Sequence, residues 1–241
     1  MFHENLYDFE YEYYDDFYQS FREDLEFLKT VVKDGERILE LMCGTGRIIE
    51  EFKDHEIWGI DNNEHMLSIA REKFKGLKNV HIENQDVLKL HDLGTFDTII
   101  IPLNSFLLFG KDEQLQILKS CKNMLSEDGK IVVDILNGFP YFEHMVYHGD
   151  TIKKDEKIIS RFFVPTIDHD FANILYFYDI FEDKNYARKY ASIKLRIMYL
   201  KDMEILTELS GLKIRKVFGN YSGGKYTEDS ERLITLLKVR L

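Results

Sequence analysis

The sequence contains little cysteine and little proline. Its 241 residues include only two cysteines, Cys43 and Cys121, so we predict no disulfide framework and expect a reducing cytoplasm as the location. There are three prolines, and no Pro/Gly-rich linker divides the chain. A chain of this length suits one α/β domain with room for an inserted subdomain, and it can bury a full core.

Long apolar runs and excess positive charge are also missing. No run approaches the roughly 20 residues that a membrane-spanning helix needs, and the acidic, aromatic first ten residues are unlike a signal peptide. The net charge is −11 at pH 7 and the pI is about 5.3, which disfavours binding to a phosphate backbone. We therefore expect neither a membrane nor a nucleic acid as partner; a homodimer stays open.

A strand, a glycine loop and a helix are predicted in succession near the start of the chain. The apolar run at 37–43 leads into Cys43-Gly44-Thr45-Gly46, and a helical pattern begins at Arg47. Glycines without a Cβ let a ligand approach the backbone, and the helix N-terminus favours a polar ligand. A tight turn between strand and helix would produce the same pattern, so the loop alone does not decide between the two interpretations.

A second predicted strand, residues 57–61, ends in Asp61. In doubly wound folds, an acidic residue at the tip of the second parallel strand binds the hydroxyls of a ribose. A dinucleotide-binding protein would carry G-x-G-x-x-G, whereas this loop reads Cys-Gly-Thr-Gly. The pair of features therefore indicates a nucleoside-containing ligand other than a dinucleotide.

Three segments, ELMCGTGR (40–47), GIDNNEHMLSIAREK (59–73) and IENQD (82–86), together resemble the class I S-adenosylmethionine-dependent methyltransferases. That family often has a glycine at the place of Met42. The resemblance covers residues 37–137 and 201–241. It implies S-adenosyl-L-methionine as cofactor and a Rossmann-like α/β fold, in which a doubly wound, mostly parallel seven-stranded sheet ends in an antiparallel hairpin.

The alternation of apolar runs supports that fold. Strands and helices that alternate predict a parallel sheet with right-handed crossovers. The predicted strands are 37–43, 57–61, 80–84, 97–103 and 129–136, and the predicted helices are 20–33, 46–54, 63–74 and 112–125. A turn is expected at 126–129.

After residue 137 the pattern changes to a period of two, typical of antiparallel strands with one wet face. We expect an inserted meander of three or four strands, then a helix at 201–210 that stops at Gly211. Strands 212–219 and 232–241 would form the closing hairpin. The predicted organisation is an N-terminal helical lid (1–36), a cofactor-binding core (37–137 and 201–241) and an inserted substrate-binding subdomain (138–200).

The cofactor site is expected where the strands end, because ligands of doubly wound sheets bind beyond the C-terminal ends of the strands. The resemblance implies that Gly44 and Gly46 pass the methionine part, that Asp61 accepts both ribose hydroxyls, and that Asp86 accepts from the adenine amino group. Helix capping is the alternative for both aspartates. The candidate cofactor-binding residues are Glu40, Cys43, Gly44, Thr45, Gly46, Asp61, Asn62, Met66, Asp86, Val87, Asn104, Tyr14 and Tyr18.

Most of the residues that we expect to close over the cofactor or to contact the substrate are tyrosines. In the small-molecule methyltransferases that this chain resembles, a Tyr-rich N-terminal helix closes over the methionine moiety; alternatively, the rings only pack that segment against a sheet. The candidate substrate residues are Tyr13, His144, Tyr176, Tyr178, Arg196 and Tyr221. A pocket of few polar groups on an apolar lining suits such side chains.

Catalytic and metal signatures are scarce. His144 and His148 stand four residues apart and would share a helix face, but no third ligand is spaced to join them, so we expect no metal. No Asn/Asp-Pro-Pro-Tyr/Phe motif follows strand 97–103, and no Pro-Cys nucleophile stands there, so methylation of nucleic-acid bases is poorly supported. The catalytic residues are unknown from the sequence.

The organisation resembles bacterial N-methyltransferases that act on amino sugars or glycine and carry an antiparallel insert. That resemblance implies methyl transfer to a small molecule, at an amine. O-methylation of a small hydroxylated molecule and a non-catalytic cofactor-binding subunit are the alternatives.

Overall fold

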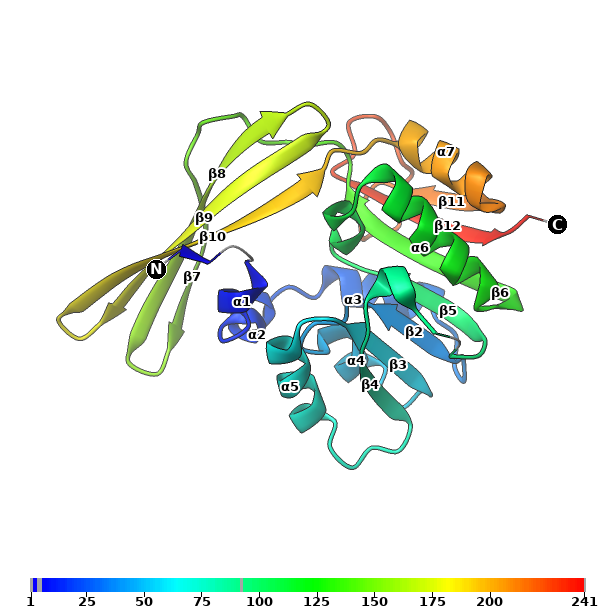
Figure 1. The fold of residues 1–241 in the computed structure, drawn as a ribbon, viewed down its shortest axis with the longest axis horizontal. Helices are drawn as coiled ribbons and strands as arrows, with labels where there is room; N and C mark the ends of the chain where they lie inside the picture. The colour runs from blue at the N-terminus through cyan, green and yellow to red at the C-terminus, as the bar shows by residue number, and fades with distance from the viewer. Residues whose placement is uncertain (1, 4–5, 92, 241) are drawn as a thin grey trace. The chain divides into compact units, whose positions relative to one another are not determined.

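The computed structural model describes residues 2–3, 6–91 and 93–240. It divides into two compact units, of which the larger comprises residues 22–138 and 198–241 and the smaller residues 1–21 and 139–197 (Figure 1). Each unit is described by itself.

The larger unit is built on a seven-stranded sheet. Its order is β11 (Leu212–Phe218), β12 (Arg232–Val239), β6 (Leu125–Leu136), β5 (Phe96–Ile101), β2 (Ile38–Leu41), β3 (Ile57–Asp61) and β4 (Val80–Asn84). The five strands from β6 to β4 are parallel, and β12 runs antiparallel to both of its neighbours. The predicted fold class, including the antiparallel closing hairpin, is confirmed.

Helices alternate with these strands along the chain. They are α3 (Glu23–Val31), α4 (Arg47–Glu51), α5 (Glu64–Lys73), α6 (Lys111–Asn123) and α7 (Leu200–Ser210), with short 3-10 turns η1 (Val87–Lys89) and η2 (Ser105–Leu108). Ile99, Ile100 and Ile101 in the middle strand are buried, as a parallel sheet covered on both faces requires. Gly211 adopts φ +74 and ends α7 as predicted.

One segment of the larger unit departs from the prediction. Strand β6 begins at Leu125, so the expected turn at 126–129 lies within the strand. Leu125 pairs with Phe96 whereas Lys130 pairs with Thr98, so the ladder is interrupted between these two pairings. Residues 126–129 therefore form an irregular part of strand β6 and not a separate turn.

The smaller unit is a meander of four antiparallel strands. They are β7 (Tyr147–Lys154), β8 (Lys157–Asp168), β9 (Phe171–Glu182) and β10 (Asn185–Arg196), and the short β1 (Phe2–His3) pairs parallel to β10. The alternating pattern therefore identified an antiparallel insert correctly.

The N-terminal segment is part of this smaller unit. Its short helices α1 (Tyr7–Glu10) and α2 (Tyr14–Tyr18) supply apolar side chains to one face of the sheet. Buried Glu10 accepts from Arg161 (Nη1 to Oε1, 2.5 Å), which joins α1 to β8. Helix α3, in contrast, packs in the core of the larger unit. The predicted boundary at residue 36 is therefore wrong: the division falls between residues 21 and 22, because the apolar stripe of α3 is buried in the larger unit.

Candidate functional site

The sheet of the larger unit has one switch in strand order. Strand β2 pairs with β3 on one side and with β5 on the other, so the chain leaves β2 and β5 in opposite directions along the sheet. The C-terminal ends of these strands and of β4 form one edge, and the loops 42–46, 62–63, 85–86 and 102–104 follow them. Ligands of doubly wound folds bind at such a switch.

The loop after β2 depends on left-handed backbone conformations. Met42 has φ +56, Gly44 φ +56 and Gly46 φ +79. A Cβ on Gly46 would lie 2.5 Å from the ring of Phe74, whereas one on Gly44 would meet only the Met66 sulfur, at 3.9 Å. Gly46 is thus required by both conformation and space, and Gly44 leaves its backbone accessible. Met42 adopts a conformation that favours glycine, which explains why glycine suits this position.

Asp61 ties this loop to the end of β3. Its Oδ2 accepts from the Gly44 amide at 2.8 Å and its Oδ1 from the Asn63 amide at 2.8 Å. Burial raises the pKa of Asp61, and the backbone hydrogen bonds oppose this rise. The capping alternative fails for Asp61, because Asn63 caps α5 by accepting from the Met66 amide. Asn63 was not singled out in the sequence.

Asp86 does cap a helical turn. Its Oδ1 accepts from the Leu88 amide at 2.9 Å, at the start of η1. Val87 beside it is buried. Asp86 therefore acts as a helix cap through Oδ1. A carboxylate retains further lone pairs that can accept from a second partner.

Glu40 is a buried carboxyl group in β2, with 2% of its surface exposed. Its Oε2 has no hydrogen-bond partner among the described residues. Burial raises the pKa of Glu40 to about 8, and the nearby Arg47 opposes this rise. Arg47 itself forms a largely buried ion pair with Asp24 of α3. A polar group of a ligand bound at this edge would give the buried Glu40 Oε2 the hydrogen-bond partner that buried polar atoms usually have.

The loop after β5 is held in an unusual conformation. Leu103 (φ +43) and Asn104 (φ +67) are both left-handed. The Asn104 amide donates to the Asp134 carbonyl (3.0 Å), and the Asn104 Oδ1 accepts from the Leu136 amide (2.8 Å). Asn104 is thus anchored to β6 through its backbone and its side-chain oxygen.

The carboxylate of Asp134 in β6 accepts hydrogen bonds from two further side chains. Its Oδ2 accepts from the Tyr221 hydroxyl at 2.8 Å, and its Oδ1 accepts from Arg232 Nε at 3.0 Å. Burial and the Asp134 carboxylate raise the pKa of Tyr221. Sequence reasoning named Tyr221 but missed Asp134 and Arg232. The available signal was Asp134 within the apolar run 131–136 and Arg232 directly before the mostly apolar run 233–237.

Several predicted tyrosines lie in the core of the smaller unit. Tyr13 is 5% exposed and Tyr178 is fully buried, with its hydroxyl donating to Glu10 at 3.0 Å. Burial raises the pKa of Tyr13 to about 12. The packing interpretation describes these two rings, whereas Tyr14 and Tyr18, with ring centroids 4.6 Å apart, are half-buried. Tyr176 also packs against this core.

The two histidines do not share a helix face. His144 is exposed with φ +59, and His148 lies in β7, where it bonds the Thr151 hydroxyl at 3.0 Å. The helical geometry considered for them is wrong because β7 continues the antiparallel pattern. Across the described part of the chain, no group of three His, Cys, Asp or Glu side chains could hold a metal.

Arg196, another predicted substrate residue, is buried at the end of β10.

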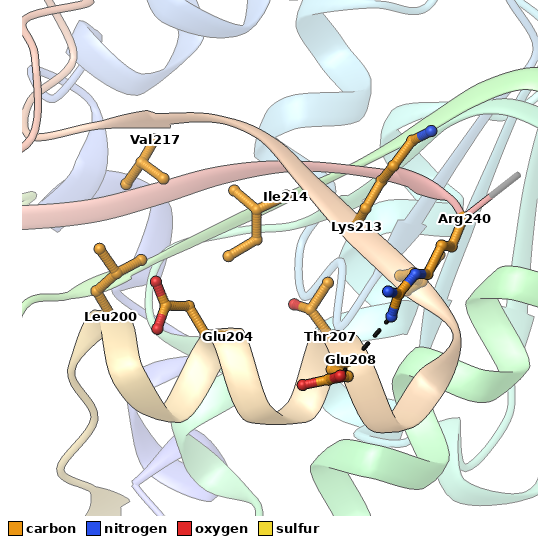
Figure 2. Close-up of a pocket in the computed structure, with 9 residues that line it drawn as sticks. Leu200, Glu204, Thr207, Glu208, Lys213, Ile214, Val217 and Arg240 are labelled. Atoms are coloured by element: carbon orange, nitrogen blue, oxygen red, sulfur yellow. Dashed lines mark ion pairs between the residues drawn. The ribbon is translucent and has the colours of Figure 1, made fainter.

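A groove of about 450 Å³ lies between α7 and β11 (Figure 2). Glu204 and Thr207 line it from the helix, and Arg240 forms a 3.8 Å ion pair with Glu208 at one end. The groove shares no residue with the loops at the switch point. It therefore stands apart from the candidate site.

No helix in the ranges that the structure describes is long and apolar enough to cross a membrane.

Comparisons with known proteins agree with this geometry. A family model described as a methyltransferase domain matches residues 38–129. The putative methyltransferase YqeM of Bacillus subtilis is 26% identical over 203 residues, which are 82% of this chain and 81% of that protein.

Two solved structures show the same fold. An S-adenosylmethionine-dependent methyltransferase from Clostridium acetobutylicum has a TM-score of 0.81 and 23% identity over 98% of this chain and 99% of that one. An amino pentose methyltransferase from Micromonospora echinaspora has a TM-score of 0.75 and 17% identity over 97% and 99% of the two chains. The domain match and the relative therefore agree with the resemblance of the loop and the two aspartates to the class I S-adenosylmethionine-dependent methyltransferases.

Proposed function

We propose that the protein transfers the methyl group of S-adenosylmethionine to an amine of a small molecule. The observation that carries this proposal is the smaller unit itself. Its antiparallel sheet and N-terminal helices are additions to the methyltransferase core, and the fold of the amino pentose methyltransferase covers them together with that core, over 97% of the chain. The net charge of −11 supports a small acceptor over a nucleic acid.

The edge of the larger unit fits the cofactor. Gly44 and Gly46 would admit the methionine part close to the backbone. Asp61 accepts the Gly44 amide through Oδ2 and the Asn63 amide through Oδ1, and the same carboxylate would accept the ribose hydroxyls of the cofactor. The second Asp86 oxygen would accept from the adenine amino group. The orphaned Glu40 Oε2 offers a further polar contact; the lining would be completed by Cys43, Thr45, Asn62, Met66 and Val87.

When bound, S-adenosylmethionine supplies an electrophilic methyl group on a sulfonium. The protein must hold the nucleophile about 3 Å from that carbon and in line with the bond that breaks. An amine must also be uncharged to attack, and a pocket that excludes water favours the uncharged form. The described chain contributes a rigid loop at Leu103–Asn104 near the switch point, anchored to Asp134. We assign it a positioning role and assign no catalytic base.

The half-buried Tyr14 and Tyr18 are the N-terminal side chains that we propose close over the cofactor. Tyr176, His144, Arg196 and Tyr221 remain proposed acceptor contacts. Tyr13 and Tyr178 contribute by supporting the sheet, because their rings are buried in the smaller unit. Both cysteine thiols are buried and unpaired by disulfide, which supports a reducing compartment such as the cytoplasm.

A panel of matched acceptors tests the proposal. The protein is incubated with S-adenosylmethionine and either an amino sugar or the same sugar with a hydroxyl in place of the amine. We expect S-adenosylhomocysteine and an N-methylated product, in equal amounts, from amino acceptors alone. Product from the hydroxyl compounds alone would favour the O-methyltransferase. Cofactor binding without turnover across the panel would favour a non-catalytic subunit.

A further inference from the structure

A second groove, of about 400 Å³, lies on the face of the seven-stranded sheet that packs against α3. Residues of β6, β12 and β11, which are neighbours in that sheet (Figure 1), line it together with the end of α3. Its apolar part is formed by Val31, Phe218 and Leu236, which are half-buried against the core of the larger unit. A groove of this volume is large enough for a small molecule.

Positively charged side chains line the same groove: Lys130 of β6, Arg215 and Lys216 of β11, and Lys238 of β12. Lys130 Nζ forms an ion pair with Glu36 at 2.7 Å. No carboxylate in the ranges that the structure describes pairs with the other three cations, and Lys238 donates to a backbone carbonyl at 3.0 Å. The groove therefore carries three positive charges that no described acidic side chain neutralises. We call it the cationic groove.

This concentration of positive charge runs against the composition of the chain. Acidic residues outnumber lysines and arginines by 43 to 32, so we expect most cations to have an acidic neighbour. In the closing hairpin, moreover, Lys213 of β11 stands directly opposite Lys238 of β12. Like charges in that position destabilise a sheet. Stability alone therefore does not account for the cluster, whereas an anion bound beside it would offset the repulsion.

Solvation by water is the ordinary explanation for separate lysines on a surface. In the cationic groove, however, the charges stand beside an apolar hollow. Lys216 Nζ lies 5.8 Å from the centre of the Phe218 ring. A cleft that is lined by charges of one sign and has walls of low dielectric constant focuses the electrostatic field and concentrates counter-ions. A ligand that uses both properties combines an acidic group with an apolar body.

We propose that the cationic groove binds a small organic anion in which a phosphate or a carboxylate is attached to an apolar body. The planar guanidinium of Arg215 can donate two parallel hydrogen bonds to either acidic group. Lys216 and Lys238 add compact positive charges. The apolar body would lie on the apolar part of the groove, which supplies the remaining contact surface.

The cationic groove is distinct from the site that we propose for methyl transfer. None of its lining residues belongs to the loops at the switch point. Lys130 lies in the first half of β6, and Lys238 is the next-to-last residue of β12, which runs antiparallel to β6. Both cations therefore lie toward the edge of the sheet opposite to those loops. The anion should bind together with S-adenosylmethionine and not in its place.

A nucleic acid is a less suitable occupant than a small anion. A phosphate backbone extends beyond a groove of about 400 Å³ and would meet the field of a chain whose net charge is −11. A small anion responds mainly to the charges that line the groove, because salt screens the more distant ones.

Isothermal titration calorimetry on the full chain tests the proposal with four probes: naphthyl phosphate, naphthoate, the neutral naphthalenemethanol and inorganic phosphate. S-adenosylmethionine is present throughout to occupy the proposed cofactor site, and the measurement requires no methyl transfer. We expect both naphthyl anions to bind roughly tenfold more tightly, or better, than the neutral compound and inorganic phosphate. The tighter of the two anions then distinguishes a phosphate ester from a carboxylic acid.

Two substitutions locate the bound anion. Arg215→Glu and Lys216→Glu each reverse one charge of the cationic groove at an exposed position, and we expect each to weaken binding of the naphthyl anions by roughly tenfold or more. Lys119→Glu, at an exposed position on α6 outside the groove, is the matched control and should bind as wild type does. Far-ultraviolet circular dichroism and thermal unfolding establish that each variant is folded.

Wild-type protein that binds neither naphthyl anion at millimolar concentration would overturn the proposal. So would equal affinity for naphthalenemethanol or for inorganic phosphate, because the groove would then recognise only one of the two features. Unchanged affinity in folded Arg215→Glu and Lys216→Glu would place the anion elsewhere, and an equal loss in Lys119→Glu would attribute binding to net charge. A short RNA that displaces naphthyl phosphate from wild type, but does not bind Lys216→Glu, would assign the groove to a nucleic acid instead.

Discussion

The carboxylate of Asp61 accepts a 2.8 Å hydrogen bond from the backbone amide of Gly44, although 17 residues separate them. This bond joins the glycine loop after β2 to the tip of β3. The loop is thus held in place by the same side chain that we propose binds the ribose, so loop geometry and cofactor affinity should depend on one residue.

We predict that Glu40→Gln weakens the dependence of stability on pH. The pKa of Glu40 is raised from 4.5 to about 8, so the folded protein holds an extra proton between these values and loses stability as pH rises through that window. Glutamine cannot ionise. In urea titrations, the free energy of unfolding of the variant should rise relative to that of wild type by on the order of a few kcal/mol between pH 5 and pH 9.

Glu36→Gln is the matched control for that measurement. Burial raises the pKa of Glu36, but hydrogen bonds from Lys130 and Thr98 outweigh it, and the pKa is lowered. An acidic group whose pKa is lowered in the folded state stabilises the fold at neutral pH, and this stabilisation is lost on acidification. Glu36→Gln should therefore lose stability relative to wild type as pH rises. A Glu40→Gln curve parallel to wild type would show that Glu40 is ionised in the folded protein.

Asp134→Ala should be strongly destabilising. Removing the carboxylate leaves the buried guanidinium of Arg232 without its partner, a loss of about 3–5 kcal/mol. Chemical denaturation measures it, with the exposed Asp54→Ala as control. In the milder Asp134→Asn, we expect turnover to fall more than cofactor affinity, since the Leu103 amide loses a carboxylate oxygen as its acceptor. Equal effects on both would argue against a positioning role.

Gly46→Ala and Gly35→Ala separate steric clash from backbone strain. Both glycines have φ near +80, at +79 and +76, but a Cβ meets the Phe74 ring at 2.5 Å only at Gly46; at Gly35 nothing lies within 4 Å. Gly35→Ala should cost about 1 kcal/mol from conformation. Gly46→Ala should cost about 1–3 kcal/mol more, from overpacking. Thermal unfolding measures both, and equal losses would mean that Phe74 moves aside freely.

We expect hydrogen exchange in residues 6–20 to slow when S-adenosylmethionine and an acceptor are added, if Tyr14 and Tyr18 close over the cofactor. Deleting the segment would not test this, because Phe9 and Phe17 belong to the core of the smaller unit. The amides of β9 in the same unit serve as reference. Unchanged exchange at saturation would assign the N-terminal segment to sheet packing alone.

The alternation of apolar strands with amphipathic helices was sufficient to predict a parallel sheet, because the buried residues of each element follow a local period. The seven strands and the closing hairpin were implied by the resemblance to the family. The glycine loop and Asp61 could be proposed for the site from the sequence because they stand at the ends of predicted strands. Long-range pairings were not predictable in this way. The Asp134–Arg232 pair spans 98 residues, and the Glu10–Arg161 pair spans 151, so no local pattern indicates either of them.

Asp86 illustrates a different limit. A carboxylate before a helical turn can cap that turn, bind a ligand, or do both, and the spacing is identical in each case. The structure shows the cap on Oδ1 and an ion pair between Oδ2 and Lys89 at 3.9 Å, and we propose that Oδ2 also accepts from the adenine amino group.

The most direct test is calorimetric titration of S-adenosylmethionine into wild-type protein and into Asp61→Ala. We predict one binding site per chain in wild type and an affinity lower by on the order of 1–3 kcal/mol in the variant, the scale of lost hydrogen bonds to a charged group. Asp54→Ala, an exposed aspartate outside the proposed cofactor site, should bind as wild type does. An unchanged affinity in folded Asp61→Ala, or no binding by wild type, would contradict the proposed cofactor site.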